Sequence, residues 1–405
     1  MSAITIERPR LPALTSVRFF AALWVALFHM QVMKAFYFGL APVRQFASIG
    51  YCGVSFFFVL SGFILVYTYE GRATKLREFW QARFARIYPA LAFCLLINAP
   101  MFFYCCLKMR AHDSKIFVTE WGWVASHMWL SAGLSVTLLE SWIPQAALAW
   151  NMPNWSLSVE AGFYLMFPFL LPRLTRLSRR QLAALVPAGW LLGLACTLAY
   201  IHFHPDGAGE VTTKTVGPWI NAIKYHPLMR LPEFVMGMVS GLLFLRNDRN
   251  RKWAWPLVLA GLAAIAAVIV LSPWIHYLVI HTALLAPAFA VLIYGVALRP
   301  AGVEVLENRA MEELGEASYP FYLLHTMVIS MFFMNWTTGI NRHQTLLGLG
   351  AWFLIAVAVA LLVDRLIERP LRRLLRPRRR RPRLLRCRFR RWLDRRVRSC
   401  LSDKK

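Results

Sequence analysis

Residues 17–36 read VRFFAALWVALFHMQVMKAF, a mostly apolar run of twenty residues that also contains Arg18 and His29. An α-helix of about 20 residues is what a bilayer core, about 30 Å thick, requires of a membrane span. Similar runs recur along the 405 residues, of which 58% are hydrophobic and 16% charged. Soluble domains are usually about 45–50% apolar and about 25% charged. The sequence therefore predicts an all-α, polytopic integral membrane protein.

Ten apolar segments are predicted to cross the membrane. The first should begin as a helix at Thr15 or Ser16, whose hydroxyls can cap a helix N-terminus. Because it carries Arg18 and His29, we expect it to remain as a true span and not to be removed as a signal sequence. The predicted spans are residues 17–36, 49–69, 88–107, 155–171, 183–202, 229–245, 254–271, 276–298, 317–337 and 346–366.

The distribution of basic residues predicts the topology, because short cytoplasmic loops collect Lys and Arg. The basic segments between spans are 70–87, 172–180 and 246–252, and the C-terminal tail is a fourth. All four lie on one side only if the apolar segment 121–139 does not cross. We therefore predict that 121–139 is a re-entrant or interfacial helix on the outer face, and that both termini are cytoplasmic.

The net charge of +26 is concentrated in the C-terminal tail. We divide the chain into a membrane-embedded domain, residues 1–370, and a basic cytoplasmic tail, residues 371–405. Within the tail, apolar residues fall at helical spacing among the arginines; they are Leu385, Phe389, Trp392, Leu393 and Val397. Such a basic amphipathic helix is expected to lie on an anionic membrane surface. The alternative is a disordered, solvated arginine tail; nucleic acid is not an expected partner, because no RNA- or DNA-reading module accompanies it.

The seven cysteines predict neither a disulfide framework nor a metal site. Their number is odd, five lie in or beside apolar spans, and none forms a CxxC pair.

Arg18 and His29 form the first candidate site, because ionisable residues inside spans are costly and often functional. They are eleven residues apart, which returns them to nearly the same helix face with His29 ~16 Å deeper. Arg18 is predicted near the cytoplasmic end, where it can hold an anion that arrives from the cytoplasm. The alternative is an interfacial arginine and a structurally hydrogen-bonded histidine.

Further candidates lie along the chain. Arg83 and Arg86 are spaced i,i+3 and can form a fork for phosphates, although any cytoplasmic loop carries arginines. Glu160 lies about a turn and a half into a span that starts at the outer face, and Glu233 is a weaker candidate of the same kind. His325 falls near mid-membrane, where a buried structural role is the alternative.

Two small-residue patterns are interpreted as helix packing. Ser61-Gly62 interrupts a bulky apolar run, and Gly237 and Gly241 form a GxxxG pair. A close approach of a ligand is the alternative for the first.

Taken together, these segments resemble the acyltransferase 3 family of bacterial membrane O-acyltransferases, over about residues 12–372. Arg18 and His29 match the family's Arg-x10-His pattern in its first span. Residues 58–63 (FVLSGF) match its second-span pattern, and Arg83–Pro89 match its cytoplasmic Arg-x-x-Arg followed by Ile-Tyr-Pro.

Three later segments extend the resemblance. Residues 155–160 (WSLSVE) match, although Ala161 and Gly162 stand where the family usually has Glu and Gln, which puts a second carboxylate in doubt. Ser318–His325 match a Ser-Tyr-x-x-Tyr-Leu-x-His pattern, and Glu368 with Pro370 a late Glu-x-Pro.

The resemblance implies an acyl-CoA donor, usually acetyl-CoA, with no bound cofactor, and a hydroxyl of an exported or cell-surface glycan as acceptor, at the cell inner (plasma) membrane. Many relatives carry a fused C-terminal hydrolase-like domain that is not seen here, so we expect a protein that works alone or with a separate partner.

The expected mechanism starts with the donor's phosphates at Arg18, Arg83 and Arg86. His29 would deprotonate the acceptor hydroxyl or relay the acyl group. Glu160 would orient or activate the acceptor on the outer side, and His325 would be a second base or a structural partner.

Two other function classes stay open at this stage. One is a carrier of a lipid-linked glycan or small solute, although such proteins often show internal symmetry and broken helices, and neither is evident in the sequence. The other is a non-catalytic scaffold, which gives no reason for Arg18 and His29 to share a face inside lipid.

Overall fold

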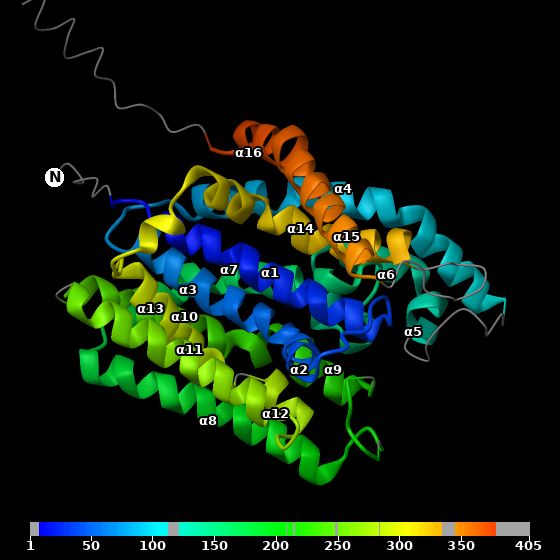
Figure 1. The fold of residues 1–405 in the computed structure, drawn as a ribbon, viewed down its shortest axis with the longest axis horizontal. Coiled ribbons are helices and arrows are strands. Elements are labelled where there is room, and N and C mark those ends of the chain that lie inside the picture. The colour runs from blue at the N-terminus through cyan, green and yellow to red at the C-terminus, as the bar shows by residue number, and fades with distance from the viewer. Residues whose placement is uncertain are drawn as a thin grey trace, which may run out of the picture.

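The computed structural model describes residues 8–111, 121–207, 209–213, 215–247, 250–282, 284–333 and 345–377, and the all-α prediction is confirmed because none of these residues forms a strand. Long helices lie side by side with their axes roughly along one direction (Figure 1). The helices are α1 Pro12–Val32, α2 Ala41–Ser48, α3 Gly53–Tyr69, α4 Leu76–Arg110, α5 Trp121–Ser126, α6 Met128–Thr137, α7 Trp155–Thr175, α8 Arg179–Phe203, α9 Pro218–Tyr225, α10 Pro227–Arg246, α11 Ala254–Leu271, α12 Tyr277–His281, α13 Ala286–Ala297, α14 Arg309–Phe333, α15 Leu346–Val363 and α16 Arg369–Leu375.

Nine helical segments of the described chain are long and apolar enough to cross a membrane, so the polytopic prediction is confirmed. They comprise α1, α3, α4, α7, α8, α9 with α10, α11, α12 with α13, and α15 with α16. The predicted span 317–337 corresponds to α14, which begins eight residues earlier with a charged stretch that includes Glu312, Glu313 and Glu316. Its residues after Phe333 lie outside the described part.

The predicted span 276–298 is confirmed as a candidate span, Tyr277–Ala297, but it is not a single helix. The structure divides it into α12, which ends at His281, and α13, which begins at Ala286 with a proline in its first turn. Proline lacks the N–H that would continue a helix from the preceding turn. One span is therefore interrupted, contrary to the expectation that the spans are unbroken.

The predicted loop 70–87 is largely helical. Helix α4 begins at Leu76 and runs for 35 residues, which is ~52 Å and more than the bilayer core needs. Arg83 and Arg86 are therefore on a continuous helix, so their side chains share one face.

The segment 121–139 forms two short helices, α5 and α6, separated at His127. They have 6 and 10 residues, whereas a span needs about 20. This agrees with the prediction that the segment does not cross.

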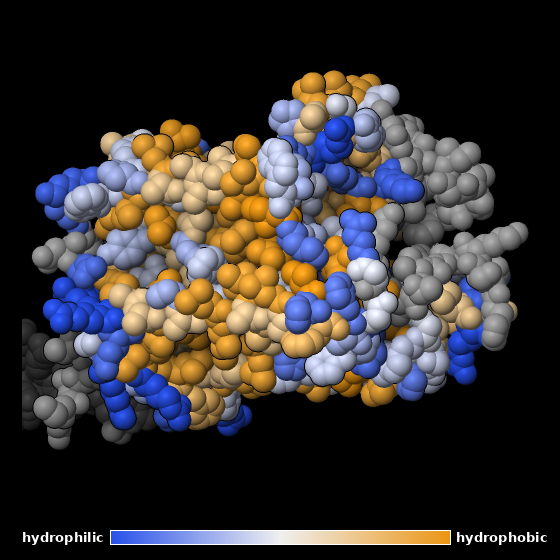
Figure 2. Space-filling model, turned by 90° about the horizontal axis from the view of Figure 1, so that it is seen from below, coloured by the Kyte–Doolittle hydropathy of each residue, from blue (hydrophilic) through white to orange (hydrophobic). Residues whose placement is uncertain are grey.

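The basic segments gather at one end of the bundle. Arg246 donates to the carbonyl of Leu177 at 2.7 Å, and Arg251 donates to the carbonyl of Arg299 at 2.7 Å. Arg8 pairs with Glu70, and Gln81 donates to Leu375, so both ends of the described chain lie there too. Figure 2 shows hydrophobic residues across the middle of one face and hydrophilic residues gathered toward its ends.

The glycines of α3 and α10 bring these two helices into backbone contact, which confirms the packing interpretation. A Cβ at Gly237 would lie 1.9 Å from the carbonyl oxygen of Val59, and one at Gly62 would lie 2.1 Å from that of Phe234. A Cβ at Gly241 would be 3.0 Å from the carbonyl oxygen of Phe63. No side chain fits at these approaches without separating the helices.

We expect Gly237→Ala to lower the unfolding temperature of the purified protein. Forcing a methyl group against the backbone of α3 should cost ~1–3 kcal/mol, the usual range for overpacking. Gly350→Ala is the matched control, because a Cβ at this helical position meets nothing within 4 Å. Equal melting temperatures for wild type and Gly237→Ala would contradict the close approach.

The boundary predicted between membrane domain and tail falls inside α16. The amphipathic part predicted for the tail, from Leu385 to Val397, lies outside the described residues.

Candidate active site

A cavity of about 200 Å³ lies among α1, α3, α4, α7 and α14, in the half of the bundle nearer the basic end. Four predicted site residues line it: Arg18, Arg83, Arg86 and Glu160. They come from three helices and are separated by up to 142 positions in sequence, so the fold is what brings them together. Ser61, Tyr164, Tyr319 and Tyr322 also line it.

Arg18 has no hydrogen bond or ion pair to another residue in the part of the chain that the structure describes, although Glu160 and Glu368 are near enough to interact with its charge. Its side chain lines the cavity together with apolar residues of α1 and α3. A cation in apolar surroundings is costly unless an anion or water compensates it. Arg18 is therefore available to a ligand.

Arg83 lies within an aromatic enclosure. Its guanidinium is 5.6 Å from the ring centroids of Tyr69 and Tyr164 and 5.9 Å from that of Phe79. The Tyr69 hydroxyl accepts a hydrogen bond from Arg83 at 3.3 Å. Cation–π contacts hold the charge in place without using most of its N–H donors.

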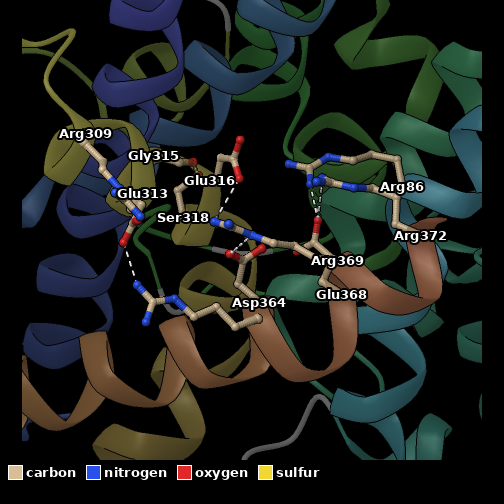
Figure 3. Close-up of polar contacts among 11 residues, drawn as sticks. Arg86, Arg309, Glu313, Gly315, Glu316, Ser318, Asp364, Glu368, Arg369 and Arg372 are labelled. Atoms are coloured by element: carbon tan, nitrogen blue, oxygen red, sulfur yellow. Dashed lines mark hydrogen bonds and ion pairs between the residues drawn. The ribbon is translucent and has the colours of Figure 1, made fainter.

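Arg86 differs from Arg83 because it is paired with a carboxylate. It forms an ion pair with Glu368 and lies 5.4 Å above the ring of Tyr319. Arg372 donates to the same Glu368 oxygen at 3.2 Å. Figure 3 shows the two arginines converging on this one carboxylate. The predicted fork is therefore asymmetric, with one enclosed and one neutralised arginine.

Glu368 is directed inward by a π-helical turn, Asp364–Glu368, between α15 and α16. The side chains of Asp364 and Glu368 are fully buried. Asp364 accepts from Arg369 at 2.6 Å, and Arg369 reaches Glu316 at 2.8 Å (Figure 3). Single π-turns often mark functional sites. The sequence predicted no role for Glu368, whose only signal was the Glu-x-Pro pattern.

Glu160 lies with the arginines. It accepts a hydrogen bond from Ser61 at 3.0 Å and another from Tyr164. No contact joins it to His29 or His325 among the described residues. The expectation that Glu160 acts on the outer side, apart from the arginines, is not supported by this position.

The two predicted histidines form a pair. Nε2 of His325 lies 3.1 Å from Nδ1 of His29, and His325 is 1% exposed. Nδ1 of His325 is 2.6 Å from the carbonyl oxygen of Tyr322, and Nδ1 of His29 is 3.0 Å from that of Val25. The sequence had predicted these residues as separate candidates.

These contacts assign the tautomers of the neutral pair. A carbonyl oxygen only accepts, so Nδ1 of His325 carries its proton and Nε2 is an acceptor. Nδ1 of His29 faces two acceptors and must therefore be protonated. Nε2 of His29 is left with its lone pair, which is the form required of a general base.

Tyr322 separates the histidine pair from the arginine-lined cavity. Its ring lines the cavity, its hydroxyl is 2.7 Å from that of Ser156, and its carbonyl contacts His325. Neither histidine lines the cavity itself. The histidine pair thus lies next to the arginine-lined cavity but outside its lining.

Glu233 belongs to a different, fully buried cluster. It forms an ion pair with Arg230 at 3.0 Å and accepts from Ser55 at 3.0 Å. Arg230 also donates to the carbonyl of His281 at 2.8 Å, beside the break between α12 and α13. This arrangement fits a structural role for Glu233 better than a substrate-binding one.

Comparison with known proteins places these observations in a family. The acyltransferase domain model, Acyl_transf_3, matches residues 11–365. Acyltransferase MdmB of Streptomyces mycarofaciens is 29% identical, with 90% of this chain and 92% of the relative covered. O-acetyltransferase OatA of Staphylococcus aureus strain NCTC 8325 is 23% identical, over 79% of this chain and 50% of the relative.

A peptidoglycan O-acetyltransferase OatA of Listeria monocytogenes is 24% identical, over 91% of this chain and 56% of the relative. The chain thus spans about half the length of these OatA relatives. No solved structure matches it. Because the family model covers most of the chain, including both predicted histidines, the protein belongs to the acyltransferase 3 family of membrane acyltransferases.

Proposed function

We propose that this protein is an acyl-CoA-dependent O-acyltransferase that moves an acyl group, most simply acetyl, to a hydroxyl of an exported or cell-surface glycan. The observation that carries the proposal is an arginine-lined cavity beside a histidine pair: Tyr322 lines the cavity, and its carbonyl oxygen contacts His325. A cationic cavity next to a base suits acyl-CoA, which carries phosphates at one end and a reactive thioester at the other.

The charge of the cavity supports acyl-CoA as the acyl donor. Arg18, Arg83 and Arg86 face Glu160 and Glu368, so positive charge is in excess. Coenzyme A carries a pyrophosphate and a further phosphate, and arginine binds such groups through several parallel N–H donors. In this proposal the phosphates occupy the basic end and the thioester points toward Tyr322 and His29.

His29 supplies the base in the proposed reaction. Its Nε2 takes the proton of the acceptor hydroxyl, whose oxygen attacks the thioester carbonyl. The C–S bond breaks, the ester forms, and the leaving thiolate takes the proton back from His29. His325 is a positioning residue, because it holds Nδ1 of His29 protonated and fixes the ring.

The acceptor assignment rests on the relatives. The Listeria protein is described as a peptidoglycan O-acetyltransferase, which supports a glycan hydroxyl as acceptor here. By the positive-inside rule, the basic end of the bundle and both termini are placed in the cytoplasm. The protein would then lie in the inner (plasma) membrane, with its basic tail on the anionic cytoplasmic surface of that membrane.

Acyl-CoA binding tests the donor assignment. We expect the purified protein to bind acetyl-CoA, with an affinity that falls as salt rises, and Arg83→Ala to weaken binding about tenfold or more, since a charge-assisted hydrogen bond contributes ~1.5–3 kcal/mol. Arg309→Ala is the matched control, because its side chain is 93% exposed at the same end. Unchanged affinity for Arg83→Ala would remove this residue from the phosphate site.

A further inference from the structure

A second pocket, of about 260 Å³, lies at the end of the bundle opposite the basic segments. Residues of α5, of the turn at Pro144–Ala146 and of α9 line it. Figure 1 shows α5 and α9 toward the end opposite the N-terminus. In the proposed topology this is the outer face, where an exported acceptor would be met.

The chemistry of this pocket differs from that of the arginine-lined cavity. Among the residues that the structure describes, its lining contains two indoles, of Trp121 and Trp123, and two side-chain amides, of Gln145 and Asn221, but no charged side chain. One face of Trp123 is stacked on His127, with ring centroids 4.5 Å apart and planes 18° apart. That contact covers one face of the ring and holds it in place at the pocket wall.

The side-chain oxygen of Asn221 is a hydrogen-bond acceptor to which no described residue donates. Its Nδ2 donates to the carbonyl of Pro144 at 3.1 Å, which orients the amide. Its Oδ1 is buried yet has no hydrogen-bond partner among the described residues. Because an unsatisfied buried acceptor costs ~1–3 kcal/mol, this oxygen calls for an N–H or O–H donor from outside the protein.

The nearby helix N-terminus does not make the pocket an anion site. Asp206 accepts hydrogen bonds from the backbone N–H groups of Trp219 and Ile220, at 3.1 and 2.8 Å, and so caps α9. A Cβ at Gly217 would lie 2.3 Å from the Asp206 carboxyl carbon, so this glycine lets the cap approach. The helix terminus is already neutralised, and a neutral ligand fits better.

A short segment joins this pocket to the histidine pair. Gln145 and Leu148 line the pocket. Three residues beyond Leu148, the Asn151 side chain donates to the carbonyl of Leu323 at 3.1 Å and accepts from Thr326 at 3.3 Å. These two positions flank His325 on α14, so the segment that lines the pocket is also bonded to the helix that carries His325.

We propose that this outer pocket binds one hexopyranose unit of the acceptor glycan, next to the unit that is acylated. A pyranose ring has an apolar C–H face that covers an indole and a rim of hydroxyls that donate to and accept from amides. The free Asn221 oxygen would take one such hydroxyl. This inference rests on the proposed glycan acceptor and adds the place where the glycan is held.

Saturation-transfer NMR tests the proposal with the full chain in lipid nanodiscs, which avoids sugar-headed detergents. The probes are the methyl glycosides of glucose, galactose, mannose and N-acetylglucosamine. We expect transfer to at least one of them, reduced at least fivefold by Trp123→Ala and by Asn221→Ala, and partly kept by Trp123→Phe. Trp274→Ala is the matched control, because Trp274 is 78% exposed outside the pocket.

Acetyl-CoA affinity, measured on the same variants, reports whether they are folded, since the two pockets share no lining residue. No transfer to any probe, or equal loss in Trp274→Ala, would overturn the sugar subsite even if acetyl-CoA binds. Sugar binding that depends on Trp123, without acetyl-CoA binding, would support the subsite and overturn the donor assignment instead.

Discussion

Replacing His29 by alanine should reduce acyl transfer by about 10²–10⁴-fold, the usual contribution of a general base. The contacts of His29 leave only Nε2 free to accept a proton, and no other titratable group lies within hydrogen-bond distance of both histidines in the described chain. The measurement is release of free CoA from acetyl-CoA by the purified protein, with crude membranes as the source of acceptor. Affinity for acetyl-CoA should change little, because His29 does not line the arginine cavity.

His325 should behave as a positioning residue in the same assay. His325→Gln keeps an acceptor near Nδ1 of His29 and should retain more activity than His325→Ala. The double variant with His29→Ala should be no slower than His29→Ala alone, because residues that act as a unit are not additive. His202→Ala, at an exposed position on α8, is the control. Wild-type rates for His29→Ala would refute the base assignment, whereas no CoA release by either protein with several acyl-CoAs would favour a carrier.

Replacing Arg18 by alanine should weaken acetyl-CoA binding by about 10–100-fold while leaving the unfolding temperature nearly unchanged. Arg18 makes no hydrogen bond or ion pair among the described residues, and the nearby Glu160 and Glu368 keep their own hydrogen-bond or ion-pair partners when it is removed. Binding of radiolabelled acetyl-CoA and thermal unfolding of the same preparation measure both quantities. Arg18→Lys should restore part of the affinity, since it keeps the charge but loses the planar fork.

Arg86→Ala provides the comparison. It also removes a cavity arginine, but it leaves the fully buried Glu368 with Arg372 as its remaining arginine partner. Breaking one side of a buried ion pair is destabilising, so Arg86→Ala should lower the unfolding temperature as well as the affinity. If the Arg18→Ala variant bound acetyl-CoA as tightly as the wild type does, Arg18 would not be a contact of the acyl donor.

Several features of the fold could be predicted from the sequence because they depend on contiguous residues. Hydropathy over about 20 residues located the predicted spans, and the distribution of Lys and Arg gave the single basic end. The segment 121–139 was predicted not to cross by the same charge argument. The break after His281 was missed, because the apolar composition of 276–298 continues through it.

The candidate site was predicted only as separate parts. Arg18, Arg83, Arg86, His29 and His325 were found because ionisable residues stand out within or beside apolar runs. Their spacing along one helix predicted shared faces, but it gave no information about which helices are neighbours. Glu160 was expected to act on the outer side, whereas the structure places it in the same cavity as the arginines, because depth in a span does not tell which cavity a side chain enters.

The sequence alone thus determined the membrane class, most of the spans, the basic end and the family resemblance, because hydropathy, charge and motif spacing are local properties of the chain. The tertiary structure alone decided that the arginines and Glu160 share one cavity, that His29 meets His325, and that Glu368 neutralises Arg86. These contacts depend on how helices that are distant in sequence pack against one another. Gly62 and Gly237, for example, let α3 and α10 touch. Such packing is set by shape complementarity between two surfaces, and no single segment of the sequence contains both.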